Sequence, residues 1–475
     1  MTTHIISRGV LLRFGLFALA LVATPSCAPE TTQGEPPATS AAVDEKPPAP
    51  PASAQGLTGP TQTLRLHGSN TIGLSLAPAL AKAFLTQLGA TNIMVNGDDR
   101  KSERIWIQGV LNGGWTSVEV YAPGSKVGFT ALASGGCDIA LASRPVKPEE
   151  AAALRSLGDM NSLASDHVIG IDGIAVIVNK NNRTSKLTTK QLGLIFDGEL
   201  TNWSQFGGAS LPIHLYSRDA KSGTHDAFTS IVMGNKTILA DAKTFDDSEA
   251  LSASVAADEG GIGYVGLPFV KDAKSVAVQD GDSTPLFPTV FTVGTEDYAL
   301  SRRLHFYAAE APRNPLVRQF VDFALSDAGQ RIVEQTGFVS LALRTDTPPL
   351  PEGAPAAYGT DVKGAVRLSV NFRFRTGSSQ LDAKAAPDAD RVLKFLALPE
   401  NRSKHVILHG FADKQGAEAA NLELSRTRGE AVAKELRSRG ISPDKIAGWG
   451  SALPIAPNDT PEGRERNRRV ELWIR

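Results

Sequence analysis

The chain has 475 residues, of which 41% are hydrophobic and 21% charged, and its formal net charge is −1. That length suggests roughly two to four domains of ordinary globular composition and excludes a chain that is disordered throughout. The balanced charge gives no reason to expect nucleic acid as a partner. The charge is unevenly spread, however: residues 366–475 hold 20 Lys+Arg and 14 Asp+Glu, a local charge of +6 against −7 for the remainder. This asymmetry predicts modules with different partners.

The sequence lacks the signatures of common metal sites and enzymes. It contains no H-E-x-x-H, no paired C-x-x-C, no G-x-S-x-G and no Walker loop. A hydrolase that uses Ser222 is a poor fit, because no histidine with a carboxylate partner can be assigned to it. We therefore predict a protein that is not an enzyme and that needs neither a metal nor a cofactor.

The N-terminal segment has the features of a secretory signal. Arg8 and Arg13 precede or border an apolar run, residues 14–23, that is too short to span a bilayer as a mature helix. A small residue precedes Cys27, as in bacterial lipoprotein cleavage sites. We predict a signal peptide over residues 1–27 and a lipid on Cys27, with ordinary signal-peptidase cleavage nearby as the alternative.

Residues 28–61 are rich in Pro, Ala, Ser and Thr. Such a segment cannot bury a core, so we expect an extended, semi-rigid tether. The second of the two cysteines, Cys137, has no partner if Cys27 is lipidated, and we expect it to be a small buried side chain.

Three stretches share one design, in which a strand ends, a short loop follows and a helix begins. The loops are Gly68–Thr71, Gly124–Gly128 and Arg218–Thr224. Serine and threonine hydroxyls, the free N–H groups of a helix start and an arginine fork all suit an oxyanion. A helix cap beside a surface arginine is the alternative for the last stretch alone. Each helix start carries about half a positive charge, so three of them predict one shared anion site.

Strands and helices alternate around these loops. We expect strands near residues 63–67, 117–121, 138–142, 169–179, 212–216 and 261–265, a helix over 188–196 and a closing helix pair within 314–336. This alternation predicts an α/β fold with mostly parallel sheets, whose ligands bind beyond the carboxyl ends of the strands.

The three loops and four further motifs resemble, in order and spacing, the PstS-like phosphate-binding proteins of bacterial ABC importers. The further motifs are Asp138–Pro145, Asp172–Asn179, Leu194–Trp203 and Gly261–Tyr264. The resemblance implies a two-lobed periplasmic-binding-protein fold of type II over residues 62–344, with the lobes closing on phosphate. It implies as phosphate contacts Ser69, Asn70, Thr71, Ser125, Ser143, Arg218, Ser222, Gly223 and Thr224. Many family members place an aspartate where this chain has Ser143, so the choice between phosphate and another oxyanion such as sulfate stays open.

Residues 345–365 begin with several prolines and glycines and predict a linker. Residues 366–475 then predict one compact α+β domain of βαβαβ type. Its expected strands are 367–374, 405–409, 445–449 and 469–474, and its expected helices are 382–398 and 420–439.

This last domain resembles the OmpA-like peptidoglycan-binding domain. The matching motifs are Phe374–Leu381, Gly410–Asp413, Asn421–Arg428 and Asn467–Glu471. The resemblance implies that Asp413, Asn421 and Arg428 bind the diaminopimelate of a peptidoglycan stem, since a carboxylate suits an ammonium and a guanidinium suits a carboxylate. The family commonly reads Gly-His-Thr-Asp, whereas Phe411 and Ala412 precede the aspartate here. The alternative is that Asp413 caps a turn and Arg428 pairs along its helix.

The favoured interpretation is a periplasmic lipoprotein, anchored in the outer membrane of a Gram-negative-type bacterium, that captures phosphate or a similar oxyanion and docks on peptidoglycan. An ABC permease is a further partner that the resemblance implies. The alternative is a structural or sensory cell-wall protein whose lobes have lost or changed their ligand, because a freely diffusing importer component needs no attachment to the wall.

Overall fold

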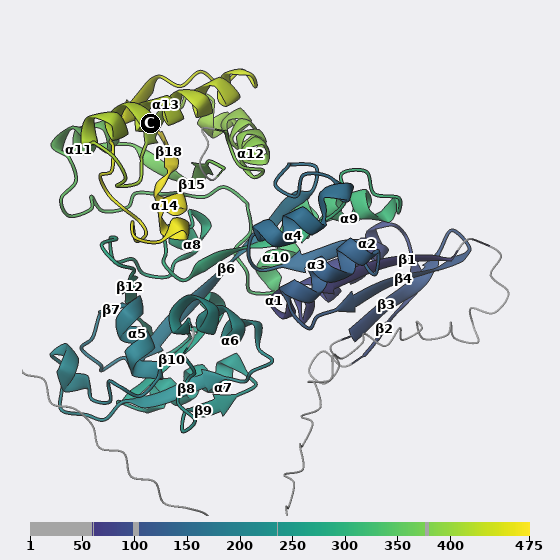
Figure 1. Ribbon diagram of the computed structural model, residues 1–475, viewed down its shortest axis with the longest axis horizontal. Helices are drawn as coiled ribbons and strands as arrows, with labels where there is room; N and C mark the ends of the chain where they lie inside the picture. The colour runs from purple at the N-terminus through teal and green to yellow at the C-terminus, as the bar shows by residue number, and fades with distance from the viewer. Residues whose placement is uncertain (1–58, 60, 98–103, 235, 376–379) are drawn as a thin grey trace, which may run out of the picture. The chain divides into compact units, whose positions relative to one another are not determined.

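The structure, a computed structural model, describes residues 59, 61–97, 104–234, 236–375 and 380–475 (Figure 1). The predicted signal peptide, Cys27 and the tether up to residue 58 lie outside these residues. Within the part of the chain that is described, no helix combines the length and the apolar character needed to cross a membrane.

One half of the large sheet runs in the order β2-β3-β4-β1-β5. Alternate residues of β5 are buried on opposite faces: Ile139 and Leu141 belong to the core with α2, α9 and α10, whereas Ala140 and Ala142 belong to the core with α3 and α4. The elements of this half are β1 (Gln62–Gly68), α1 (Asn70–Gly73), α2 (Leu76–Gln87), β2 (Thr91–Asn96), β3 (Arg104–Leu111), β4 (Gly114–Tyr121), α3 (Ser125–Ser134), β5 (Ile139–Ala142), α4 (Pro148–Ala153), α9 (Leu316–Leu325) and α10 (Asp327–Gln335).

The other half of the sheet continues in the order β10-β8-β9. Its core contains Phe196, Trp203, Phe228 and Tyr264, all of them buried. The elements are β7 (Lys186–Thr188), α5 (Thr189–Phe196), η3 (Trp203–Phe206), β8 (His214–Arg218), α6 (Gly223–Phe228), the π-helical η4 (Thr229–Met233), β9 (Lys243–Phe245), α7 (Ser248–Ala257), β10 (Gly261–Gly266), η5 (Leu267–Phe269), β11 (Lys274–Ser275), β12 (Ala277–Gln279) and α8 (Val290–Gly294).

Two strands, β6 (Asp166–Val178) and β13 (Ser301–Tyr307), join the halves. The first part of β6 pairs with β13 and its last part, from Ile174, pairs with β10. The other edge of β13 pairs with β5. Nearly all of β6 is buried, as expected of an apolar strand covered on both faces. We call β6 and β13 the hinge strands.

The α/β class is confirmed, but the prediction of mostly parallel sheets is wrong. Parallel pairs join β1 to β4 and β5, and β8 to β9 and β10. Antiparallel pairs join β3 to β2 and β4, and the hinge strands to each other, to β5 and to β10. Part of the difference arises because β2, β3 and β13, which were not predicted, are antiparallel to their neighbours. The predicted strands β6 and β10 are also antiparallel to each other.

The C-terminal residues form a separate sheet in the order β14-β15-β18-β16-β17, in which only the β16–β17 pair is parallel. Its core includes Leu368, Phe372, Val392, Leu408 and Leu436. The elements are β15 (Val366–Arg373), α12 (Ala385–Ala397), η6 (Pro399–Asn401), β16 (Val406–Gly410), α13 (Glu418–Arg437), β17 (Lys445–Gly448), α14 (Pro461–Asn467) and β18 (Arg469–Ile474).

The segment predicted as a linker, residues 345–365, contains regular structure. Its β14 (Thr345–Asp346) is the edge strand beside β15, and its α11 (Ala356–Val362) packs on the C-terminal sheet. Tyr358 accounts for this packing: its ring is buried, and its hydroxyl donates to Glu471 Oε2 at 3.1 Å. One aromatic anchor thus orders a segment whose prolines and glycines suggest a flexible connection.

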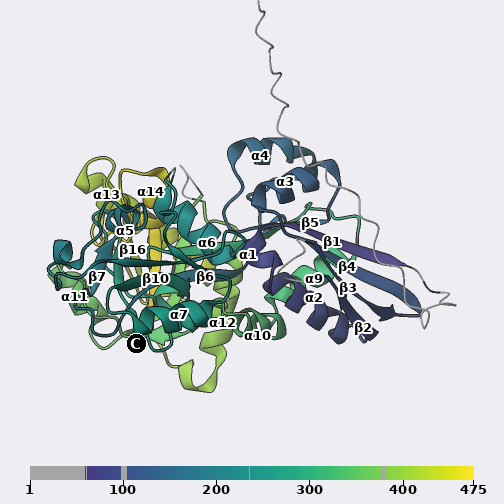
Figure 2. The same ribbon diagram turned by 90° about the horizontal axis from the view of Figure 1, so that it is seen from below.

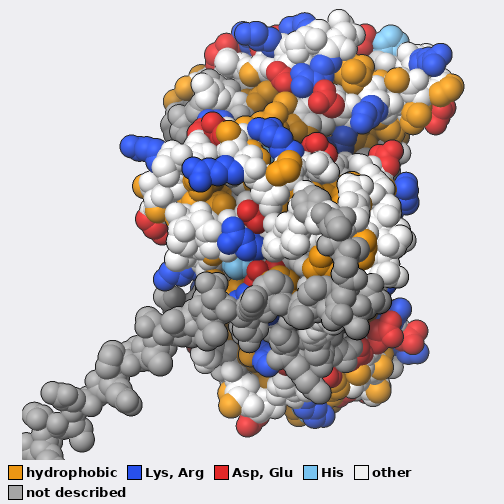
Figure 3. All heavy atoms as spheres, turned by 90° about the vertical axis from the view of Figure 1, so that its right-hand side faces the viewer, with side chains coloured by type: hydrophobic (Ala, Val, Ile, Leu, Met, Phe, Trp, Pro, Cys, Tyr) orange, Lys and Arg blue, Asp and Glu red, His pale blue; other side chains and the backbone are white. Residues whose placement is uncertain are grey.

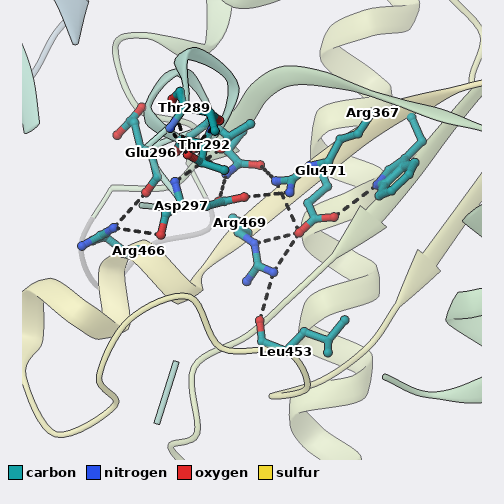
Figure 4. A network of polar contacts seen from close by, with 12 residues as sticks. Thr289, Thr292, Glu296, Asp297, Arg367, Leu453, Arg466, Arg469 and Glu471 are labelled. Carbon is teal, nitrogen blue, oxygen red and sulfur yellow. Dashed lines mark hydrogen bonds and ion pairs between the residues drawn. The ribbon is translucent and has the colours of Figure 1, made fainter. Parts of the chain in front are cut away.

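The loop between α8 and β13 makes a buried polar contact with the C-terminal sheet (Figure 4). Arg367 of β15 donates from Nη1 to Asp297 Oδ2 at 2.7 Å, and its Nη2 lies 3.4 Å from Glu471 Oε1. Asn371 donates from Nδ2 to Asp297 Oδ1 and to the Thr295 carbonyl, each at 2.7 Å. These side chains are buried, so the contact replaces hydration with protein partners.

Glu296 is the acidic centre of the same contact. Its carboxylate lies 2.9 Å from Arg303 Nε, 3.5 Å from Arg373 Nη2 and 3.8 Å from Lys384 Nζ. Its carbonyl accepts from Arg466 Nη2 at 2.9 Å, a bond drawn in Figure 4. Burial raises the pKa of Glu296, but the three cations outweigh burial and hold this pKa well below the ordinary value.

Replacing Glu296 by glutamine leaves three buried cations without their shared carboxylate. We expect Glu296→Gln to lower the free energy of unfolding by about 3 kcal/mol at pH 7, measured by urea unfolding. A depressed carboxyl pKa stabilises the fold above the unfolded value, and this stabilisation is lost as the pH falls. The difference between variant and wild type should therefore shrink below pH 4.5, the ordinary glutamate value.

Glu352 is exposed and serves as the matched control. Glu352→Gln should change the free energy of unfolding by less than about 0.5 kcal/mol. Equal losses in the two variants, or a loss at Glu296 that does not vary with pH, would contradict the assignment.

Candidate anion site

The three predicted loops all lie at the carboxyl end of a strand and at the start of a helix. Ser69 precedes α1, Gly124 precedes α3 and Ser222 precedes α6. Ser125, Gly223 and Thr224 are then the first residues of their helices, and Asn70 and Thr71 open α1. The local structure that the sequence predicts at these positions is thus present.

None of these three helices has a side-chain cap. Several other helices do, with hydroxyl, amide or carboxylate oxygens accepting from the first turn, at Thr188, Asn202, Asp247, Thr289, Ser326 and Thr460. Ser69 and Ser222 are buried and yet cap nothing, and Ser69 Oγ has no hydrogen-bond partner among the described residues. The amide of Thr71 donates to Asn70 Oδ1 at 2.9 Å, whereas the N–H groups of Asn70, Ser125 and Gly223, the first residues of the three helices, remain available to an external acceptor.

Hydrogen bonds bring three of the predicted residues, Ser69, Ser125 and Ser143, together in the first half of the sheet. The amide of Ser69 donates to the Leu141 carbonyl at 2.8 Å, and the amide of Gly124 donates to the Gly68 carbonyl at 2.8 Å. Beyond β5, the amide of Ser143 donates to Ser125 Oγ at 3.3 Å. The loops that begin α1 and α3 and the end of β5 thus meet at one place, with Thr71 at the edge toward α6.

The start of α6 lies against α1, as both ribbon views show (Figure 1, Figure 2). Thr71 Oγ1 lies 3.3 Å from the Gly223 carbonyl. A Cβ atom added to Gly223 would lie 2.4 Å from Thr71 Cα, so the two backbones approach as closely as glycine allows. Ser222, Gly223 and Thr224 therefore join the predicted residues of the first half.

Arg218 is the last residue of β8, and its guanidinium is held within its own half. Nε donates to the Phe245 carbonyl at 3.2 Å, Nη2 donates to the Asp246 carbonyl at 2.9 Å, and Nη1 contacts Ser248 Oγ. Burial lowers the pKa of Arg218, and nearby aspartates oppose this shift. In the described residues Arg218 makes no hydrogen bond to the other predicted site residues, so the structure gives no direct contact between its guanidinium and them.

Arg302, which the sequence analysis missed, contacts both loops. It lies on β13 and donates from Nη2 to Thr71 Oγ1 at 2.6 Å and to the Gly223 carbonyl at 3.0 Å. A signal was present in the sequence: Arg302 stands two and four residues before Leu304 and Phe306, which are core residues of the same strand. A charged residue on the same face of a strand as buried apolar residues needs a polar partner, and this requirement could have identified Arg302 as a residue with a specific contact.

The predicted peptidoglycan residues lie in the C-terminal domain. Asp413 Oδ2 pairs with Arg468 Nη1 at 3.2 Å, and Asp413 Oδ1 accepts from the Gln415 amide at 2.9 Å. The bond from the Gln415 amide means that Asp413 caps a turn, as the alternative prediction has it. Arg428 donates to the Phe411 carbonyl at 3.3 Å and, among the described residues, has no hydrogen-bond partner along its own helix, which differs from that alternative.

Asn421 and Arg428 are both buried on α13, seven residues apart and therefore on one side of the helix. Burial and the charge of Arg468 lower the pKa of Arg428 to about 10, while Asp413 opposes them. The Nε atoms of Arg428 and Arg468 are buried without a hydrogen-bond partner in the described chain. Arg468 is a second residue that the sequence analysis did not select, although it lies in one of the motifs.

Comparison with known proteins assigns the two parts of the chain. A family model of the PBP superfamily domain matches residues 112–328, and one of the OmpA family matches residues 373–468. Protein SphX of Synechococcus elongatus is 33% identical over 244 residues, which are 49% of this chain and 71% of the relative. The phosphate-binding protein PstS of Staphylococcus saprophyticus is 35% identical over 227 residues, 46% of this chain and 69% of the relative. The chain belongs to the PstS-like family of phosphate-binding proteins.

The chain also carries an OmpA-family domain at its C-terminal end. Among solved structures, a possible phosphate binding protein from Planctomyces limnophilus is 25% identical with a TM-score of 0.49, covering 60% of this chain and 94% of that one.

In this PstS-like protein, the two residues directly after β5 are Ser143 and Arg144, and neither side chain is a carboxylate. Ser143 is buried, and the guanidinium of Arg144 forms two bonds to Glu150, at 2.8 and 2.7 Å. The charge of Arg144 is thus balanced by α4, and the hydroxyl of Ser143 is what position 143 offers to a ligand.

The close approach of α1 and α6 makes Gly223 sensitive to substitution. We expect Gly223→Ala to lower the free energy of unfolding by about 1–3 kcal/mol, because the added methyl group would overlap the Thr71 backbone. Urea unfolding of the variant measures this loss. Gly266→Ala is the control, since its Cβ would lie 3.5 Å from the nearest Phe269 ring atom, an ordinary contact. If the two substitutions cost the same, the two helices are not in contact.

Proposed function

We propose that this protein captures phosphate, or a similar oxyanion, between the two halves of its PstS-like domain. The observation that carries the proposal is the meeting of helix starts that have buried serines but no side-chain caps, in a chain of the phosphate-binding family. Ser69, Asn70, Thr71, Ser125, Ser143, Ser222, Gly223 and Thr224 would donate to the anion, and Arg218 would supply positive charge. Binding without turnover is the role we assign.

We further propose that the OmpA-family domain docks on peptidoglycan through Asp413, Asn421 and Arg428. Arg428 and Arg468, each with a buried nitrogen that has no hydrogen-bond partner among the described residues, lie beside one carboxylate there, a set that suits a ligand bearing both an ammonium and a carboxylate. The diaminopimelate of a peptide stem has both groups. Arg468 would share this role, because it contacts Asp413 directly.

The location we propose is the periplasm, with a lipid on Cys27 in the outer membrane and the segment 28–61 as the tether. An ABC permease would then receive the captured anion.

On the face shown in Figure 3, cationic and anionic side chains are interspersed, in keeping with the net charge of −1. We infer that association with a permease or with the wall would depend on particular contacts and not on a large field of one sign.

A sensory or structural role is the second candidate. The buried contact between the 295–298 loop and the C-terminal sheet favours it, because it fixes the wall-binding domain to the residues that lead into hinge strand β13. A protein that reports on anion supply, or only links envelope layers, would use such a contact. The two candidates differ in whether the bound anion is passed on.

Calorimetric titration of the mature chain with inorganic phosphate tests anion capture. We expect one site in the wild type and at least about tenfold weaker binding in Arg218→Ala, since losing a positive charge near the bound anion costs about 1.4 kcal/mol or more. Arg313→Ala, at an exposed position, is the control and should bind like the wild type.

The same titration with sulfate as competitor tests Ser143. Competition equal to that of phosphate would show that the hydroxyl at this position accepts a fully ionised anion. If no oxyanion binds the wild type, the capture proposal fails and the structural role is favoured.

Sedimentation with isolated peptidoglycan tests wall docking. Asp413→Ala should shift the chain from pellet to supernatant, because the ammonium of the stem loses its carboxylate partner and Arg468 loses its ion pair. Asp459→Ala, an exposed aspartate of the same domain, should sediment like the wild type. Unchanged sedimentation of Asp413→Ala would remove the wall-docking assignment.

A further inference from the structure

Arg302 joins the hinge to both anion-binding loops. It stands directly opposite Asp172 in the β13–β6 register, and its Nε lies 3.1 Å from Asp172 Oδ2. Its Nη2 donates to Thr71 Oγ1 and to the Gly223 carbonyl, and its Nη1 lies 3.4 Å from Asp226 Oδ2. One guanidinium therefore touches α1 from the first half, α6 from the second half and hinge strand β6.

These bonds decide which way the Thr71 hydroxyl can donate. A hydroxyl has one hydrogen and two acceptor lone pairs. Thr71 Oγ1 accepts from Arg302 at 2.6 Å, while its own hydrogen is offered only a 3.3 Å contact with the Gly223 carbonyl. The Gly223 carbonyl also accepts from Arg302 Nη2, at the shorter distance of 3.0 Å. The bond from Thr71 Oγ1 to that carbonyl is the longest of these contacts, so an anion can replace the carbonyl as its acceptor, and donation from a cation makes the hydroxyl a stronger donor.

The buried charge of Arg302 is balanced and hydrogen-bonded by the residues around it. The side chain of Arg302 is 11% exposed and that of Asp172 is 7% exposed, so the pair is largely shielded from water. Four contacts occupy its three nitrogens, which is the condition for keeping a buried charge. Lysine could keep the charge beside Asp172, but it lacks the fork that reaches Thr71 and Gly223 together.

We propose that Arg302 is a positioning residue for the bound anion. It fixes the spacing between the loops 69–71 and 222–224 and directs the Thr71 hydroxyl toward the ligand, without holding the anion itself. The inference rests on the proposed phosphate-binding function, and it adds a residue that the family motifs in the sequence did not indicate.

The test is calorimetric titration of the mature chain with inorganic phosphate. We expect Arg302→Gln to weaken binding about 10- to 100-fold and Arg302→Lys about tenfold, in line with the loss of hydrogen bonds from a charged donor. The control Arg313→Gln should stay within about twofold of the wild type. Because Arg302 acts through Thr71, the double variant with Thr71→Val should bind little more weakly than the weaker of the two single variants.

Binding by Arg302→Lys and Arg302→Gln within about twofold of the wild type would overturn the inference, and so would effects of Arg302→Gln and Thr71→Val that multiply. A ligand-free measurement separates this failure from failure of the proposed function. Without phosphate, amide hydrogen exchange of segments 70–73 and 223–226 should become faster together in both Arg302 variants. If exchange is unchanged in either segment, the inference is overturned even when the wild type binds phosphate. If exchange becomes faster in the variants but the wild type binds no phosphate, the proposed function is overturned, and the role of Arg302 in directing Thr71 toward the ligand is overturned with it.

Discussion

The ion pair between Asp172 and Arg302 connects the two hinge strands with both loops of the proposed anion site. It crosses the two hinge strands, and the same guanidinium reaches Thr71 and Gly223 in the two loops that face each other. The next residue, Arg303, points to the other face of β13, as alternation along a strand requires. There it contacts Glu296 and Asp382 beside the C-terminal sheet. One short strand therefore carries both the contact to the anion loops and the contact to the C-terminal domain.

The proposed anion site depends on hydrogen bonds that its serines do not make within the protein. Ser69 and Ser222 stand where a serine ordinarily caps a helix, and neither does so. Helix N–H groups without a protein acceptor are satisfied by water or by a bound anion. Gly223 contributes by its missing side chain, because a methyl group there would separate α6 from Thr71.

Local features could be predicted from the sequence, and long-range ones could not. The loop at Ser69, the helix that begins at Ser125 and the loop at Ser222 follow from strand periodicity, glycine and serine, all within a few residues. The contact between Thr71 and Arg302 joins residues 231 positions apart, and no local pattern encodes it. The same holds for Asp297 and Arg367, and for Tyr358, whose burial orders a segment that composition alone describes as a linker.

In the proposed function, loops from both halves close on a single anion. Amide hydrogen exchange of the mature chain, with and without saturating phosphate, measures this closure. We expect protection to rise together in residues 69–73, 125–128 and 222–226, because all three helix starts would donate to one ligand. Protection that rises in only one of these segments, or in none, would contradict it.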